Sequence, residues 1–211
     1  SLIVADTSPA LYFGTRVRFK SVQAARAGAV AAWSALRDGD RIAALRGSAQ
    51  QALVPPAGGT RGVLRSLDAL VRWYGERPAD DGGLQLALEQ AARVLHPGAR
   101  AVVLADPVSA QAVAAATWSS LAMHVEVELV LLLDPLEISP PRCVLPLQTR
   151  AGRLQLDLTA SNVREAWHEA LVGPVEALCR QLPGRRIRVS TLVTDDASDA
   201  WLSATPNRSV G

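Results

Sequence analysis

Short apolar segments alternate with helix-like segments along most of this chain, and this alternation is the strongest constraint on its fold. Apolar runs predict strands at about 2–5, 41–45, 52–54, 101–105, 125–133 and 187–193. Between these runs, apolar residues recur at helical spacing, as in Val22, Ala25, Ala29, Trp33 and Leu36. Strands that alternate with helices form a mostly parallel sheet covered on both faces. The sequence therefore predicts an α/β, doubly wound fold.

The alternation is interrupted once, after the predicted strand at 125–133. Cys143–Leu147 and Arg153–Leu158 flank the turn Arg150-Ala151-Gly152, which predicts a β-hairpin inserted before the last helix. Continuous helical patterns predict one helix over about 109–122 and a long one over about 162–182.

Composition limits the class of protein. With 49% hydrophobic and 20% charged residues, the chain has ample material for a core. We expect one domain over residues 1–202 and a flexible tail over 203–211. Because the chain starts directly on a core strand, we also expect the domain to be part of something longer.

Charge and cysteine content narrow the partners and the compartment. A net charge of +2 argues against a nucleic-acid-binding protein, which would show a basic face. The longest charge-free apolar run, Leu129–Leu133, is too short to span a membrane. Cys143 and Cys179 lack metal-ligand spacing, so they are predicted to be reduced thiols of a cytoplasmic protein.

Oxygen-bearing side chains follow two of the predicted core strands. Asp6 and Ser8 come directly after the first strand, and Asp106 follows the strand at 101–105. Open α/β sheets bind ligands at the carboxyl ends of such strands, where the strand order reverses. Carboxylates and hydroxyls also suit a magnesium-type cation, so these residues are a candidate metal site. The alternative is that Asp6 and Asp106 cap the next helices or accept hydrogen bonds from loop amides.

Three cations crowd the loop after the first strand. Arg16, Arg18 and Lys20 are a candidate docking patch for an acidic partner, or a charge that stands in for a missing metal. The alternative is a solvated loop with one structural salt bridge. Nucleophile–base motifs and glycine-rich nucleotide loops are absent from the sequence, which argues against the common enzyme classes.

The chain resembles a family through several separate segments. These are Asp6-Thr7-Ser8-Pro9-Ala10, Phe13-Gly14, Lys20, Gly39-Asp40-Arg41, Leu104-Ala105-Asp106 and Asp134-Pro135-Leu136-Glu137. They are similar to the von Willebrand factor A-like bacterial proteins of the domain-of-unknown-function fifty-eight family, from residue 1 to about 202.

The resemblance implies a von Willebrand factor A-like, Rossmann-like fold with a metal-ion-dependent adhesion site. Asp6, Ser8 and Asp106 match three ligands of that site, whereas Ala10 replaces a serine. The family's threonine is expected within 81–84, where none is present; Thr60 is interpreted as a helix N-cap instead. The site is therefore expected to be degenerate and to bind Mg²⁺ or Mn²⁺ weakly.

The function implied by the resemblance is that of a protein-interaction module, not an enzyme. Members of the family are encoded beside MoxR-type AAA+ ATPases, so the expected partner is such an ATPase, acting in assembly or maturation of other proteins. Two alternatives stay open. One is a metal-independent scaffold in which the Arg16–Lys20 loop makes the contact; the other is a metal-dependent hydrolase that uses Asp6 and Asp106.

Overall fold

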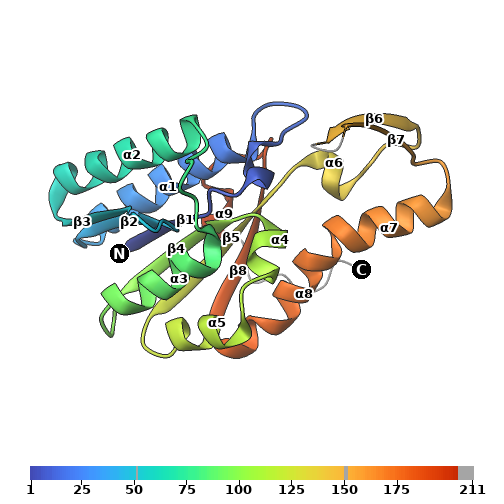
Figure 1. Cartoon of the computed structure of the whole chain (residues 1–211). Helices are drawn as coiled ribbons and strands as arrows, with labels where there is room; N and C mark the ends of the chain where they lie inside the picture. Colours follow the sequence, from blue (N-terminus) through green and yellow to red (C-terminus); the bar gives the residue numbers. More distant parts are fainter. Residues whose placement is uncertain (51, 150–151, 204–211) are drawn as a thin grey trace.

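The centre of the molecule is a mostly parallel β-sheet (Figure 1). The structure is a computed structural model that describes residues 1–50, 52–149 and 152–203. Within these residues, six strands pair in the order β3-β2-β1-β4-β5-β8. Their bounds are Leu2–Ala5 (β1), Ile42–Arg46 (β2), Leu53–Ala57 (β3), Arg100–Ala105 (β4), Glu126–Leu133 (β5) and Ile187–Val193 (β8).

Strand direction agrees with the predicted α/β architecture. β1 pairs in parallel with β2 on one side and with β4 on the other, and β5 pairs in parallel with β4 and β8. Among the six described strands of this sheet, only β3, at the edge, runs antiparallel to its neighbour, β2. The chain therefore winds outward in both directions from β1 and β4, so the strand order reverses between these two.

Helices cover both faces of the sheet because alternate strand residues point to opposite sides. Leu2 and Val4 of β1 join one buried cluster with α3, α4, α5 and α8, whereas Ile3 and Ala5 join the other cluster with α1, α2 and α9. The helices and 3₁₀ turns are η1 (Pro9–Tyr12), α1 (Lys20–Arg37), α2 (Gly59–Gly75), α3 (Gly83–Val94), α4 (Pro107–Gln111), α5 (Ala115–Ala122), α6 (Pro135–Ile138), α7 (Ser161–Leu171), α8 (Gly173–Gln181), η2 (Pro183–Arg185) and α9 (Ala200–Ser203).

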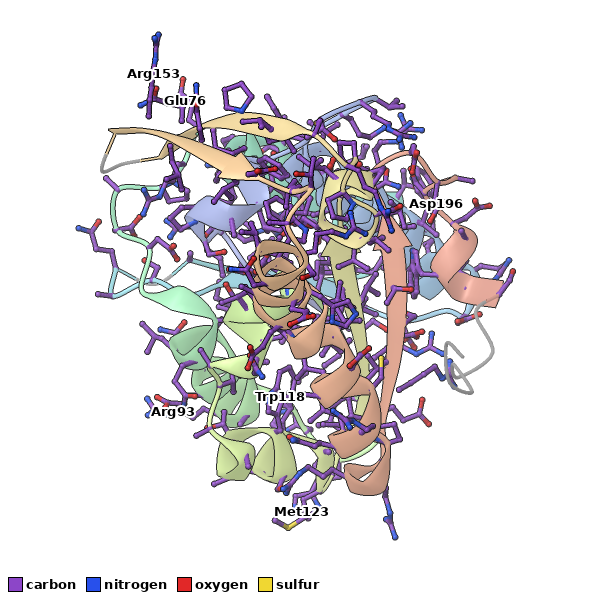
Figure 2. The ribbon with its side chains drawn as sticks, turned by 90° about the vertical axis from the view of Figure 1, so that its right-hand side faces the viewer. Glu76, Arg93, Trp118, Met123, Arg153 and Asp196 are labelled. Atoms are coloured by element: carbon purple, nitrogen blue, oxygen red, sulfur yellow. The ribbon has the colours of Figure 1, made fainter. Side chains whose placement is uncertain are left out.

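The predicted hairpin is confirmed and lies apart from the main sheet. β6 (Val144–Thr149) and β7 (Gly152–Asp157) pair with each other in a separate two-stranded sheet above α6 and α7 (Figure 1). Arg153 projects outward from this hairpin (Figure 2). Residues 150 and 151 of the expected turn, and residues 204–211 of the expected flexible tail, lie outside the described residues.

Two predicted helices are each divided in the structure. The helix expected over 109–122 is α4 followed by α5, because Asp106 and Pro107 begin a short helix and Ala114 is extended. The helix expected over 162–182 is α7 followed by α8, and the division falls at Val172, just before Pro174, which lacks an amide donor. Among the described residues, no helix combines the length and the apolar composition that crossing a bilayer requires.

We expect Gly47→Ala to destabilise the fold, because the segment after β2 meets the beginning of α3 at this residue without room for a side chain. A Cβ at Gly47 would lie 2.0 Å from the backbone carbonyl oxygen of Gly83. Overpacking of this kind costs about 1–3 kcal/mol, measurable as a loss in the free energy of unfolding by urea denaturation. The matched control is Gly75→Ala, whose Cβ would meet open space. Equal stabilities of the two variants would contradict the close approach.

Candidate functional site

The predicted crevice lies at the carboxyl ends of β1 and β4. These strands are hydrogen-bonded neighbours, and the strand order reverses between them. Asp6 follows β1 and Asp106 follows β4, and both side chains are almost fully buried. The amide of Asp106 donates a hydrogen bond to Oδ2 of Asp6 over 3.0 Å. The structure thus brings the two predicted carboxylates together at the position where α/β sheets bind ligands.

Both carboxylate oxygens of Asp6 already accept hydrogen bonds. Oδ1 accepts from the amide of Ser8 over 2.9 Å, and Oδ2 accepts from the Ser8 hydroxyl over 3.1 Å. The Ser8 hydroxyl in turn accepts from the hydroxyl of Ser109. Burial raises the pKa of Asp6 to about 6, although the amides of Asp106 and Ser8 act in the opposite direction. Asp6 therefore serves mainly as an acceptor for loop groups, as the alternative interpretation expected.

Asp106 has two structural tasks. Its Oδ1 accepts from the amide of Val108 over 2.9 Å, so it is the N-cap of α4, again as the alternative expected. Its Oδ2 accepts from the ammonium of Lys20 over 2.7 Å. The same ammonium donates to Oε1 of Glu137 over 2.6 Å.

Lys20 is therefore a buried cation between two carboxylates. Its side chain is 1% exposed, and the ring centroid of Phe13 lies 5.9 Å from Nζ. Burial alone would lower the pKa of Lys20, but the charges of Asp106 and Glu137 outweigh this effect and raise it. The ammonium is thus held in its charged form by the two acidic partners.

Another buried carboxylate, Asp134, follows β5 and holds the beginning of the loop that leads to Lys20. It accepts from the amide and the hydroxyl of Thr15, from the amide of Leu136 and from the hydroxyl of Thr194. Burial would raise the pKa of Asp134, but these hydrogen bonds hold it below its ordinary value. Glu137 completes a capping box by accepting from the Asp134 amide over 2.8 Å.

The three cations predicted to form one patch have different environments. Arg16 is 66% exposed. Arg18 is half-buried and donates to the side chain of Gln23 and to the carbonyl of Asp196, which follows β8 and is labelled in Figure 2. Lys20 is buried, so its assignment to an exposed docking surface is corrected: its side chain points into the carboxylate cluster and away from solvent.

These side chains do not fit a bound magnesium ion. Mg²⁺ needs oxygen ligands at about 2.0–2.1 Å, and the acceptors of Asp6 and the hydroxyl of Ser8 are engaged in hydrogen bonds. The ammonium of Lys20 already occupies Oδ2 of Asp106 and Oε1 of Glu137, so a divalent ion at these oxygens would have to displace it. In the described part of the chain, no group of three or more His, Cys, Asp and Glu side chains has a metal-holding arrangement.

The resembled metal site has further hydroxyl ligands at position 10 and within 81–84, and this chain has no hydroxyl side chain at either place. Ala10 lies in η1, and the segment 81–84 approaches the site through Asp81, which accepts from the hydroxyl of Thr7 over 3.0 Å. Thr60 lies in the first turn of α2 and is exposed. Its interpretation as an N-cap is wrong, because Gly58 occupies the cap position and no side chain caps the helix.

A separate cavity of about 540 Å³ lies beside the edge strand β8. Apolar side chains of α7, α8 and β8 line it, among them Leu171, Val175 and Val193. Glu137 also borders this cavity, so it touches both the cavity and the Lys20 cluster.

The family model described as "Protein of unknown function DUF58" matches residues 1–173. The chain belongs to this family. The DUF58 match contains Asp6, Lys20, Asp106 and Glu137, so the whole carboxylate–ammonium cluster lies within the family's part of the chain. A comparison with curated protein sequences returns no match.

Two solved structures share the fold of this DUF58 chain. The conserved hypothetical protein BatB from Bacteroides thetaiotaomicron is 13% identical, with a TM-score of 0.61, and the alignment covers 96% of this chain and 93% of that one. An aerotolerance-related membrane protein from Bacteroides fragilis is 14% identical, with a TM-score of 0.56 and coverages of 96% and 94%. At these identities the similarity shows the fold alone.

Sequence reasoning located Asp6, Ser8 and Asp106 but missed the two acidic side chains that follow β5. Asp134 and Glu137 were part of the family resemblance and had no assigned role. Their spacing of three residues before an apolar segment is the signature of a capping box, which was the available signal. Nothing in the local sequence indicated that Glu137 would also receive the ammonium of Lys20.

We expect the Asp6 carboxyl to make stability depend on pH. Because the pKa of Asp6 is raised from 3.8 to about 6, its contribution is fully present below 3.8 and is lost as the pH rises through about 6. Asp6→Asn removes this titration. The unfolding free energy of the wild type, relative to Asp6→Asn, should therefore fall by about 3 kcal/mol across this window. Urea denaturation at several pH values measures the difference, and parallel profiles would refute the raised pKa.

Proposed function

We propose that this chain is a protein-interaction module that binds its partner at the carboxyl ends of the sheet strands. The module is proposed to have the von Willebrand factor A-like form of the α/β fold and to work in the cytoplasm. The observation that carries the proposal is a loop that exposes two apolar side chains and is anchored at both ends by buried carboxylates.

The loop extends from Thr15 to Lys20. Asp134 binds Thr15 at the first end, and Asp106 and Glu137 bind Lys20 at the other. Since both ends are fixed inside the protein, the loop loses little conformational freedom when it binds. Preorganisation of this kind lowers the entropic cost of association.

Apart from the half-buried Arg18, the side chains between these anchors face solvent. Val17 is 61% exposed and Phe19 is 53% exposed, and Val22 at the start of α1 adds an adjoining apolar surface. Arg16 stands beside them with most of its side chain in water, and its guanidinium lies 3.8 Å from Oδ2 of Asp195. Exposed aromatic and aliphatic side chains next to an arginine are typical of interface hot spots. We name the surface formed by Arg16, Val17, Phe19 and Val22 the loop patch.

The partner we propose is a MoxR-type AAA+ ATPase, acting with this chain in the assembly or maturation of other proteins. This part of the proposal rests on membership of the DUF58 family together with the resemblance to its von Willebrand factor A-like members. Arginine in the loop patch favours an acidic surface on the ATPase.

A degenerate adhesion site could contact its partner through a bound metal ion or without one. The geometry supports contact without a metal ion. A partner carboxylate that completed a metal shell would need Asp6, Ser8 and Asp106 as ligands, yet their polar atoms are committed to hydrogen bonds and to Lys20. The same commitments leave Asp6 and Asp106 without a role in hydrolysis, so we propose no enzymatic activity.

We expect the double variant Val17→Ser, Phe19→Ser to bind the ATPase at least about tenfold more weakly, because it removes the apolar part of the loop patch. The measurement is biolayer interferometry with the immobilised chain and the purified MoxR-type ATPase from the same genome. Val71→Ser is the matched control, since Val71 is 65% exposed on α2, outside the loop patch.

Chelation separates the two modes of contact. We expect wild-type affinity to be the same in EDTA and in millimolar Mg²⁺. Loss of binding in EDTA would contradict the metal-independent mode. Wild-type affinity in the double variant would contradict the loop patch, and an absence of wild-type binding would contradict the choice of partner.

A further inference from the structure

We propose that the ammonium of Lys20 is the resident cation of the strand-end site and takes the place of a divalent metal ion. The proposal rests on the arrangement of the described side chains and does not depend on which protein binds the loop patch. Its starting point is that the site has the carboxylates of a cation site, yet a side chain of the same chain supplies the positive charge.

The contacts of Lys20 are those of a cation enclosed by its ligands. Nζ lies 2.7 Å from Oδ2 of Asp106 and 2.6 Å from Oε1 of Glu137, and its third side faces the ring of Phe13 at 5.9 Å. The exposed fractions of the three charged side chains are 1%, 3% and 12%. An ion pair this deeply buried differs from a surface salt bridge, because removing one partner leaves the others buried without a counter-charge.

The cation joins three separate segments at one point. Lys20 is the first residue of α1, Asp106 follows β4, and Glu137 lies in α6 after β5. A divalent ion bound by Asp106 and Glu137 would connect only the last two of these segments, whereas the ammonium also attaches the beginning of α1. The ammonium lies beside Asp106, which is one of the predicted metal ligands. This position identifies the ammonium as the group that replaces the metal ion.

The loss of hydroxyls agrees with this substitution. Ala10 stands where the resembled site has a serine, and the segment 81–84 has no threonine. Neither position therefore offers a hydroxyl ligand to a metal. A tethered ammonium requires hydrogen-bond acceptors alone, and Asp106 and Glu137 provide them.

The consequence is a site whose charge does not vary with the concentration of divalent ions. The cation cannot dissociate, so the three segments stay connected and the loop patch keeps its position under all metal conditions. Removal of the ammonium should also leave Asp106 and Glu137 facing a vacant space of the right charge for a metal. The proposal therefore predicts that loss of Lys20 creates metal binding.

The test is a thermal-shift titration with MgCl₂ and MnCl₂ on the wild type, Lys20→Ala and the double variant Lys20→Ala, Asp106→Asn. We expect no shift for the wild type. Lys20→Ala should melt at a lower temperature than the wild type, and saturating metal should raise its melting temperature by about 3 °C or more. The double variant should lack this rise, because it has lost one ligand.

Two results would overturn the proposal. One is a metal-dependent rise in the wild type as large as that of Lys20→Ala, since metal and ammonium would then coexist. The other is a folded Lys20→Ala that does not respond to either metal.

A second measurement covers the case in which Lys20→Ala fails to fold. Lys20 is the single lysine of the sequence, so after treatment with an amine-reactive ester, peptide mass spectrometry distinguishes its acylation from that of the α-amino group. We expect Lys20 to resist acylation in the native wild type, with or without millimolar Mg²⁺, and to react after denaturation in guanidinium. Rapid native acylation, or acylation induced by Mg²⁺, would show that the ammonium is not the resident cation.

Discussion

The arrangement of the strand-end loops depends on one buried interaction, the ammonium of Lys20 between Asp106 and Glu137. Transfer of these charges from water is costly, and the pairing offsets the cost only while all three side chains keep their positions. The segments that carry them are therefore coupled: the loop before α1, the turn after β4 and the short helix α6. Asp134 extends the same framework to Thr15 and Thr194, so the ends of β5 and β8 also belong to it.

Much of the fold could be predicted because it depends on local apolar patterns. β1, β4 and most of β5 are continuous apolar runs, as expected for strands covered on both faces. These three strands and the edge strand β8 were each predicted within one residue. The divisions within these two helices were not predicted, because the apolar pattern continues across 109–122 and across 162–182. In the structure each segment forms two helices. In the second case Gly173-Pro174 was the available signal.

The site could be predicted only where it follows from sheet topology. Asp6 and Asp106 meet because the carboxyl ends of neighbouring parallel strands lie side by side, so two apolar runs were enough to place them. The partners of Lys20 lie 86 and 117 residues further along the chain, and their meeting depends on which strands are adjacent and on where a long side chain points. Local sequence carries neither kind of information. The basic loop was therefore interpreted as one patch, although burial separates Lys20 from Arg16.

The most direct measurement of the central claim is the ¹⁵Nζ NMR spectrum of the chain labelled with [ε-¹⁵N]lysine, in which Lys20 supplies the one lysine signal. A buried, hydrogen-bonded ammonium exchanges its protons slowly with water, so the account predicts a resolved NH₃⁺ signal at neutral pH that Mg²⁺ does not change. A signal broadened by fast exchange, or one that Mg²⁺ shifts or abolishes, would contradict it.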